Sequence, residues 1–287
     1  DLDHGARLQL RVDASGERRL VRPEVRLDEL VLESEVRTQV ERFIASARVR
    51  STVLTDWGFG KVLRGGNALT ALFAGPPGTG KSATAEAVAT ALERPMLRCS
   101  LSAVVSQYVG ETTKNLDALF RAARDHRAVL VFDEADALFA RRIAVQTSND
   151  RLANAETAAL LTQLERHDGV VVLTTNLECE LDPAFHRRIG LCARFDEGDA
   201  RRRAAIWKKL MPSDAPLAED VNLGELAKAH ELSPAGIRNA LLAAAFQAAS
   251  QGVGARLITQ RMLRVAAQEQ VVGRPARRTT AAEPEPS

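Results

Sequence analysis

One short segment limits the folds open to this chain more than any other feature: Gly75-Pro76-Pro77-Gly78-Thr79-Gly80-Lys81-Ser82. It fits the pattern G-x-x-x-x-G-K-[ST] and lies between an apolar run and a helical pattern, which is the context that a phosphate-binding loop requires. The glycines let backbone N–H groups turn toward phosphate oxygens, and the following helix N-terminus favours negative charge. We expect Lys81 at the β- and γ-phosphates of ATP and the Ser82 hydroxyl on Mg²⁺. The positions expected to bind nucleotide are Pro76, Pro77, Gly78, Thr79, Gly80, Lys81, Ser82 and Ala83.

A second set of functional residues is expected where an apolar run over 129–132 ends in two carboxylates, Asp133 and Glu134. Ligands of open α/β sheets bind at the carboxyl ends of the strands. Asp133 is therefore placed to hold Mg²⁺ beside the nucleotide, and Glu134 to orient and polarise the attacking water. An Asp-Glu pair after a strand is by itself more often a solvated helix start, and the upstream loop favours the functional interpretation. Asp136 is expected to be a solvated acid or an N-cap.

Short apolar runs alternate with helical patterns along most of the chain. The runs lie at 68–74, 95–101, 128–132, 170–174 and 191–195, and the helical patterns between them at 81–92, 112–124 and 150–166. Such an alternation indicates an α/β fold with a five-stranded parallel sheet covered on both faces, an α/β/α sandwich. Helical patterns alone follow, at 199–210, 223–230, 234–251 and 258–270, and predict a small all-helical domain.

The two ends of the chain fit this pattern less well. Residues 1–26 predict a short hairpin, because Leu8, Leu10 and Val12 alternate with polar residues before turn-forming residues at 13–16. The alternative is the end of a missing upstream domain, since the chain opens on aspartate rather than methionine. Helical spacing over 28–47, with Ser34 as candidate N-cap, predicts a helix before the sheet. Residues 273–287 have too few apolar side chains to pack and are expected to be disordered.

Composition removes several classes of function. The formal net charge is only +2, so electrostatics gives no reason to expect a nucleic-acid partner. No apolar run reaches the roughly 18 residues of a membrane span, so membrane insertion is not expected. The cysteines, Cys99, Cys179 and Cys192, lack metal-ligand spacing and predict reduced thiols in a cytoplasmic protein.

Taken together, these residues resemble the AAA clade of the AAA+ superfamily, a clade of protein remodellers. The resemblance runs from about Leu27 to Gln270 and rests on the loop 75–82, the acidic strand 129–139 and the run 150–176. The last of these looks most like bacterial single-ring members, some of which accompany phage-tail-like contractile injection systems. The resemblance implies a P-loop NTPase core over 27–197 and a helical lid over 198–272.

The resemblance also implies catalytic roles outside the two nucleotide motifs. Asn176 ends the fourth apolar run and matches the sensor-1 residue, which lies near the γ-phosphate and positions water. Arg187 and Arg188 lie in a stretch similar to the one that carries arginine fingers, which enter the neighbouring subunit's site and neutralise charge in the transition state. The alternative is a solvated basic pair near a helix end.

Two further elements are placed by the same resemblance. A lid helix is expected to begin at Pro234 with Ser233 as N-cap, and Arg238 matches its sensor-2 arginine, with pairing to a surface acid as the alternative. Tyr108 and Val109 resemble the aromatic and aliphatic residues of a pore loop, where an amphipathic ring grips an extended polypeptide. The alternative is a tyrosine packed against the sheet edge.

The leading hypothesis is a ring, hexameric by resemblance, that hydrolyses ATP with Mg²⁺ and pulls a protein client through its central pore. An arginine supplied by the next subunit requires a head-to-tail homo-oligomer, which closes into a ring or spirals. An adaptor or upstream domain is expected to select the client. The alternatives are a DNA-handling AAA+ ATPase of the helicase- or clamp-loader type, a slow regulatory ATP-binding ring and a P-loop small-molecule kinase.

Overall fold

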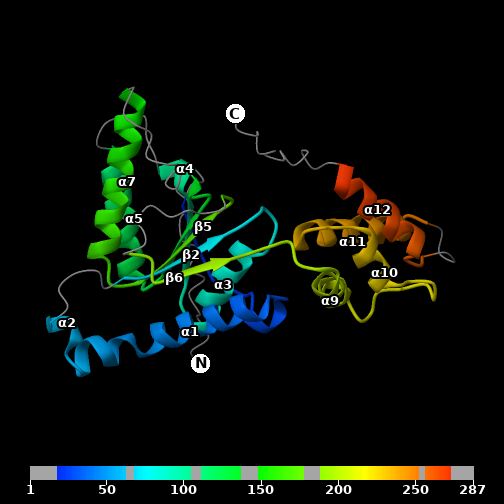
Figure 1. Cartoon of the computed structure of the whole chain (residues 1–287), viewed down its shortest axis with the longest axis horizontal. Helices are drawn as coiled ribbons and strands as arrows, with labels where there is room; N and C mark the ends of the chain where they lie inside the picture. The colour runs from blue at the N-terminus through cyan, green and yellow to red at the C-terminus, as the bar shows by residue number, and fades with distance from the viewer. Residues whose placement is uncertain are drawn as a thin grey trace, which may run out of the picture. The chain divides into compact units, whose positions relative to one another are not determined.

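The computed structural model describes residues 18–62, 68–104, 111–136, 148–177, 188–251 and 256–272 of the 287-residue chain (Figure 1). The chain divides into two compact units, Asp1–Asp196 and Glu197–Ser287, called here the first unit and the second unit. The expected N-terminal hairpin falls largely outside the described residues and the expected disordered tail wholly so, and both stay predictions.

The first unit is built on a six-stranded sheet. Along the chain the strands are β1 (Arg18–Val21), β2 (Leu69–Ala74), β3 (Met96–Ser100), β4 (Val129–Asp133), β5 (Val170–Thr175) and β6 (Leu191–Arg194). Their order across the sheet is β1-β3-β4-β5-β2-β6, and every neighbouring pair except β1–β3 is parallel. The five strands predicted from the apolar runs are all present, so the predicted α/β fold is confirmed.

The additional strand, β1, comes from a segment that the sequence placed in an N-terminal extension. It pairs antiparallel with β3, with Arg18 opposite Cys99 and Val21 opposite Met96. Two of its four residues are arginines, so no apolar pattern indicated a strand, although charged side chains are common on sheet edges. The sheet therefore includes residues that precede the expected boundary of the core.

Helices cover both faces of the sheet and form the predicted three-layer sandwich. The described helices of the first unit are α1 (Ser34–Ser51), α2 (Phe59–Val62), α3 (Lys81–Ala91), α4 (Leu101–Val104), α5 (Glu111–Asp125) and α7 (Ser148–Arg166), of which α1 and α3 pack on one face and α5 and α7 on the other. Leu130 and Phe132 of β4 are buried in a cluster with α5 and α7. Val129 and Val131 alternate with them and are buried with α1 and α3, as the two-residue period of a strand requires.

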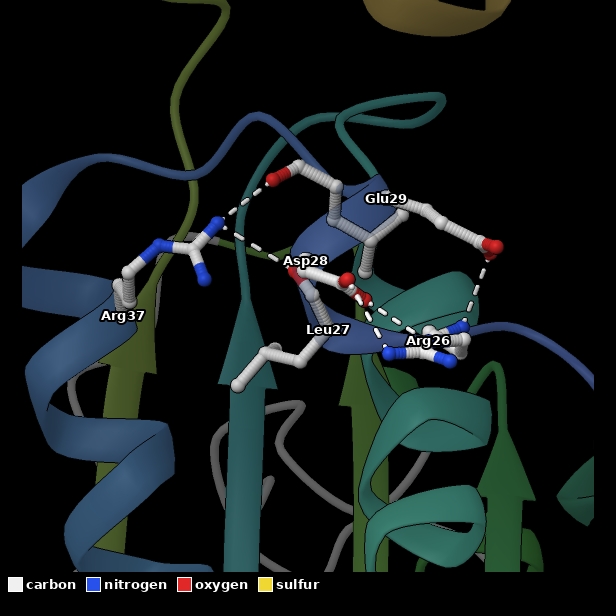
Figure 2. A network of polar contacts seen from close by, with 6 residues as sticks. Arg26, Leu27, Asp28, Glu29 and Arg37 are labelled. Carbon is white, nitrogen blue, oxygen red and sulfur yellow. Dashed lines mark hydrogen bonds and ion pairs between the residues drawn. The ribbon is translucent and has the colours of Figure 1, made fainter.

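The chain approaches α1 through a 3-10 turn, η1 (Leu27–Glu29), which is fastened to that helix by an arginine. Figure 2 shows Arg37 of α1, whose Nη2 donates to the carbonyl oxygens of Leu27 and Leu30 at 3.3 and 2.7 Å. Glu86 of α3 accepts from the backbone N–H just upstream, at Glu24, with 3.0 Å. The segment before α1 is thus tied to two helices of the same face.

The start of α1 differs from the prediction. The helix begins at Ser34 itself, and Glu33 occupies the N-cap position in an extended conformation without a side-chain cap bond. The prediction of Ser34 as N-cap is therefore wrong, and no α-helix covers 28–33. At its other end α1 continues into a π-helical turn, Thr52–Asp56.

The second unit contains four helices within its described residues, 197–251 and 256–272. They are α9 (Ala200–Leu210), α10 (Leu223–Ala229), α11 (Pro234–Ala249) and α12 (Gln260–Val272). Trp207 of α9 is fully buried in this unit. The predicted cap of α11 is confirmed, because Ser233 Oγ accepts from the backbone N–H of Gly236 and Pro234 is the first helical residue. In neither unit does a described helix have the length and apolarity needed to cross a bilayer.

Candidate functional site

The loop between β2 and α3 has a backbone that only glycine can provide at its two ends. Gly75 has a φ of +142°, and a Cβ there would lie 1.9 Å from the carbonyl oxygen of Phe195. Gly80, the N-cap of α3, has a left-handed φ of +103° with open space around it, so its conformation rather than crowding favours glycine. The Gly75 N–H donates to the Thr175 carbonyl oxygen at 3.2 Å. The loop is therefore fixed against the carboxyl ends of two strands, β5 and β6.

Lys81, the first residue of α3, is held by this loop. Its Nζ donates to the carbonyl oxygens of Gly75 and Pro76, both at 2.7 Å, and to Asn176 Oδ1 at 3.1 Å. The residue is only 6% exposed, so its ammonium group is directed by contacts within the protein rather than by water. A positive charge placed at the N-terminus of a helix behind a glycine-rich loop is suited to phosphate oxygens.

Asp133, the last residue of β4, lies next to Ser82 of α3. Its Oδ1 accepts from Ser82 Oγ at 3.0 Å and from Thr174 Oγ1 at 2.8 Å. Its Oδ2 forms an ion pair with the Nε of Arg98 on β3. A hydroxyl and a carboxylate side by side fit Mg²⁺, which takes oxygen ligands and is commonly held by one or two carboxylates together with substrate phosphates. The structure thus brings the two expected metal ligands together, beside an arginine that the sequence did not indicate.

Glu134 follows Asp133 in an unusual backbone conformation. Its φ is +55°, a left-handed value that costs a non-glycine residue about 1–2 kcal/mol, and strained conformations of this kind cluster at functional sites. The Ala135 N–H donates to the Thr174 carbonyl oxygen at 2.8 Å and holds the turn to β5. This turn leaves Glu134 exposed between two buried neighbours, so its carboxylate is open to water.

Asp136 belongs to this cluster, although the sequence predicted a solvated acid or an N-cap at this position. Instead of a solvated acid it is half-buried, and its Oδ1 accepts from Thr175 Oγ1 at 2.6 Å and from the Asn176 N–H at 2.8 Å. Burial lowers the pKa of Lys81, and the carboxylates of Asp136 and Asp133 oppose this effect. The available signal was the polar end of the neighbouring strand, Thr-Thr-Asn, which must meet whatever follows β4.

Asn176 connects these groups. Its Oδ1 accepts from Lys81 Nζ, and its Nδ2 donates to Asp136 Oδ2 at 3.4 Å. The predicted sensor-1 residue therefore lies between the phosphate-loop lysine and the turn that follows the acidic strand. This placement agrees with the position that the resemblance implied, while its role in positioning water stays a prediction.

The structure describes one of the two expected arginine fingers. Arg188 forms an ion pair with Glu165 of α7, and its Nε donates to Glu165 Oε1 at 2.8 Å. The alternative to a finger was a solvated arginine, and it did not predict this ion pair with an acid of the same chain. Arg187 lies outside the described residues.

The remaining predicted site residues lie either in the second unit or outside the described residues. Arg238 is exposed on α11, and its Nη2 donates to Asn239 Oδ1 at 3.5 Å. Tyr108 and Val109 lie outside the described residues, as does Cys179, and their predicted roles stay predictions. Cys99 of β3 and Cys192 of β6 are not in disulfide bonds, and burial raises the pKa of Cys192.

The sequence matches known proteins in the region that contains this cluster. Residues 71–197 match the family described as "ATPase family associated with various cellular activities (AAA)". The chain is 36% identical over 171 residues to the proteasome-activating nucleotidase of Methanopyrus kandleri, covering 56% of this chain and 38% of that protein. It is 41% identical over 121 residues to the probable 26S proteasome regulatory subunit 10B of Caenorhabditis elegans, covering 40% and 30%.

A third relative is not named for the proteasome. The chain is 34% identical over 165 residues to the cell division cycle protein 48 homolog of Archaeoglobus fulgidus, covering 55% of this chain and 22% of that protein. The chain therefore spans well under half of the length of each of these three curated relatives.

Proposed function

This chain carries an AAA ATPase domain over residues 71–197, and we propose that it binds ATP with Mg²⁺ in a ring of identical subunits and hydrolyses it to remodel a protein client. The cluster at the carboxyl ends of β4 and β5 supports this best. Ser82 Oγ and Asp133 Oδ1 are 3.0 Å apart, and Lys81 reaches Asn176 at 3.1 Å. Polar side chains from three separate segments converge here: Lys81, Ser82 and Asp133 were expected at a nucleotide site from the sequence motifs, and Asn176 from the family resemblance.

The binding roles follow from the type of each group. Lys81 exchanges its contacts with the loop carbonyls for phosphate oxygens, which carry more negative charge. Ser82 and Asp133 would hold Mg²⁺, which neutralises charge on the phosphate oxygens when it is bound. The N–H groups of the loop residues 76–83 complete the phosphate cradle.

Hydrolysis also needs a positioned water. Glu134 accepts a proton from that water or orients it, because its carboxylate is exposed beside Asp133. Asn176 contributes from the end of β5, where the contact with Asp136 fixes its amide. Neither group needs to move far, since both lie at the ends of neighbouring parallel strands.

The arginine fingers make the active enzyme an oligomer. Arg187 and Arg188 are proposed to act on the nucleotide of the next subunit, in a head-to-tail ring of six. The ion pair of Arg188 with Glu165 does not prevent this, since partly exposed pairs of this kind contribute only about 0–1 kcal/mol. Arg188 can therefore exchange one carboxylate for a phosphate at small cost.

The client is proposed to be a polypeptide. Two of the relatives are named for the proteasome, and the near-neutral charge of this chain gives no support to a DNA-handling role. Tyr108 and Val109 would contact the polypeptide in the pore, and an adaptor or upstream domain would select it.

Residues 27–197 are proposed as the core and 198–272 as the lid carrying Arg238, in a cytoplasmic protein. A slow regulatory ring is the second candidate, because an intact Glu134 does not fix the turnover rate.

Mixing two inactive variants tests the ring. Arg188→Ala should cut turnover while sparing ATP affinity, and Lys81→Ala should abolish binding, so each preparation alone has little activity. Mixed rings contain interfaces with an intact site on one side and an intact finger on the other, and should recover turnover. Arg121→Ala, an exposed arginine on α5, is the matched control and should behave as wild type. If labelled subunits exchange and no mixture recovers activity, the finger assignment is wrong.

A second experiment addresses the client. Stimulation of ATP turnover by unfolded protein rather than by DNA separates the protein remodeller from its main alternative, a DNA-handling ATPase.

A further inference from the structure

Arg98 is a charged residue on an interior strand and lies opposite a like charge on the neighbouring strand. It belongs to β3, an interior strand of the sheet, and is the exposed residue in a strand otherwise buried or half-buried. It lies directly opposite Arg19 in the antiparallel β1–β3 pair. Like charges in directly opposite positions destabilise a strand pair, so the guanidinium of Arg98 needs compensation from elsewhere.

That compensation comes from the carboxylate proposed to hold Mg²⁺. In the parallel β3–β4 pair Ser100 is opposite Asp133, so Arg98 is two residues before this position and on the same face of the sheet. From there its Nε reaches Asp133 Oδ2. The Asp133 side chain is 11% exposed and that of Arg98 is 49% exposed. A nearly buried carboxylate is thus paired with a cation that has access to solvent.

The contacts of Asp133 divide between its two oxygens. Oδ1 accepts from two neutral hydroxyls, Ser82 Oγ and Thr174 Oγ1, whereas Oδ2 is paired with Arg98. A carboxylate group offers about four lone-pair positions, and three of them are used by these contacts. A divalent ion bound by Ser82 and Asp133 therefore meets a carboxylate whose negative charge already has a cationic partner.

We propose that Arg98 is the resident counter-ion of Asp133: it neutralises the carboxylate before metal binds, withdraws when Mg²⁺ arrives, and thereby sets the Mg²⁺ concentration that the site requires. This inference rests on the proposed function, in which Asp133 is a metal ligand. Arg98 is a positioning residue here, because it acts on the metal only through Asp133. Its half-exposed side chain can leave for solvent, which a buried cation could not do.

Metal binding, rather than turnover, gives the decisive measurement. Mn²⁺ is titrated into the full chain saturated with ADP, and free Mn²⁺ is followed by electron paramagnetic resonance. Arg98→Gln should lower the Mn²⁺ concentration at half-saturation by about three- to tenfold, because the competing charge is gone. Arg98→Lys keeps a cation and should stay close to wild type. Arg121→Gln removes an exposed arginine on α5 and measures the effect of general positive charge alone.

Each other outcome overturns the proposal. An unchanged half-saturation in Arg98→Gln means that the arginine does not compete with metal, and a weaker Mn²⁺ affinity means that it assists the metal. An equal shift in Arg121→Gln assigns the effect to net charge. If Arg98→Gln does not fold, Arg98→Lys titrated across ionic strength must still lose its competition as salt screens the pair. Failure of the proposed function is distinct, since the wild-type chain would then bind no Mn²⁺ with ADP.

Discussion

The polar contacts that build the site in the first unit and the helix caps of the second unit act over different distances in the sequence. In the first unit the side-chain contacts Lys81–Asn176, Ser82–Asp133 and Thr174–Asp133 join residues 41 to 95 positions apart, and they meet at one end of the sheet. In the second unit the N-cap residues Asn222 and Ser233 each accept from an N–H three residues further along the same helix. Long-range polar contacts near buried strands order a site, whereas local caps only stabilise the helices that contain them. Substitutions in the two units should therefore affect different measurements.

The largest effect expected from this comparison is on turnover. Glu134→Gln removes the carboxylate that orients water and should lower ATP hydrolysis by about 10²–10⁴-fold while nucleotide affinity and melting temperature stay near wild type. Single-turnover hydrolysis and binding of a fluorescent nucleotide measure the two quantities separately.

Glu93→Gln is the matched control for this variant. Glu93 is also an exposed glutamate with a positive φ, +54°, but it follows α3 away from the carboxyl ends of the strands. It should leave turnover unchanged. Wild-type turnover in Glu134→Gln would remove the assigned role, and a loss in both variants would point to the backbone rather than the carboxylate.

A smaller effect is expected on the pH dependence of stability in the first unit. His167 is 1% exposed, packs edge-on against Phe120, and has no hydrogen-bond partner for either ring nitrogen among the described residues. Burial lowers the pKa of His167 from its ordinary value of 6.5 to about 4. Between these values the unfolded chain binds a proton that the folded chain does not, so stability is complete above pH 6.5 and falls by about 3 kcal/mol at pH 4.

Comparison with a variant isolates this contribution. His167→Phe keeps a ring against Phe120 and removes the titration, so its melting temperature should fall less than that of wild type between pH 6.5 and 4. The pKa of His230 in the second unit is also lowered by burial, and His230→Phe reports the corresponding dependence there. Parallel curves for wild type and His167→Phe would show that His167 is charged in the folded protein.

The smallest effect belongs to the second unit. Ser233→Ala removes the cap of α11 and should cost about 1 kcal/mol of stability while leaving nucleotide binding unchanged. Chemical denaturation measures the change. Ser250→Ala, at the other end of the same helix, removes a hydroxyl that donates to the Gln247 carbonyl oxygen instead of capping an N–H, and should cost less. A loss of ATP affinity in Ser233→Ala without loss of stability would contradict the division drawn above.

The same division explains what the sequence could predict. The five apolar strands and the cap at Ser233 were predictable because a strand's apolar run and a helix cap are recorded in neighbouring residues. The loop around Lys81 was predictable because its spacing is tied to one chemistry. The contacts of Asp136 and Arg98 could not be predicted, because their partners lie 39 to 40 and 35 positions away and no pattern in the neighbouring residues indicates them. Ser34 shows the limit of local signals, since the helix simply begins one residue too early for it to act as a cap.

The contact between Gly75 and Phe195 has a mechanical consequence. The Phe195 N–H donates to the Ala74 carbonyl oxygen at 2.7 Å, and the backbones pass so closely that no side chain fits at position 75. The base of the loop and the end of the last strand are therefore one stiff joint, and the main chain continues from it to the start of the second unit at Glu197. We expect any displacement that a nucleotide imposes on the loop to move Phe195 and the end of β6 with it, because the close backbone contact leaves little room for the two segments to move separately.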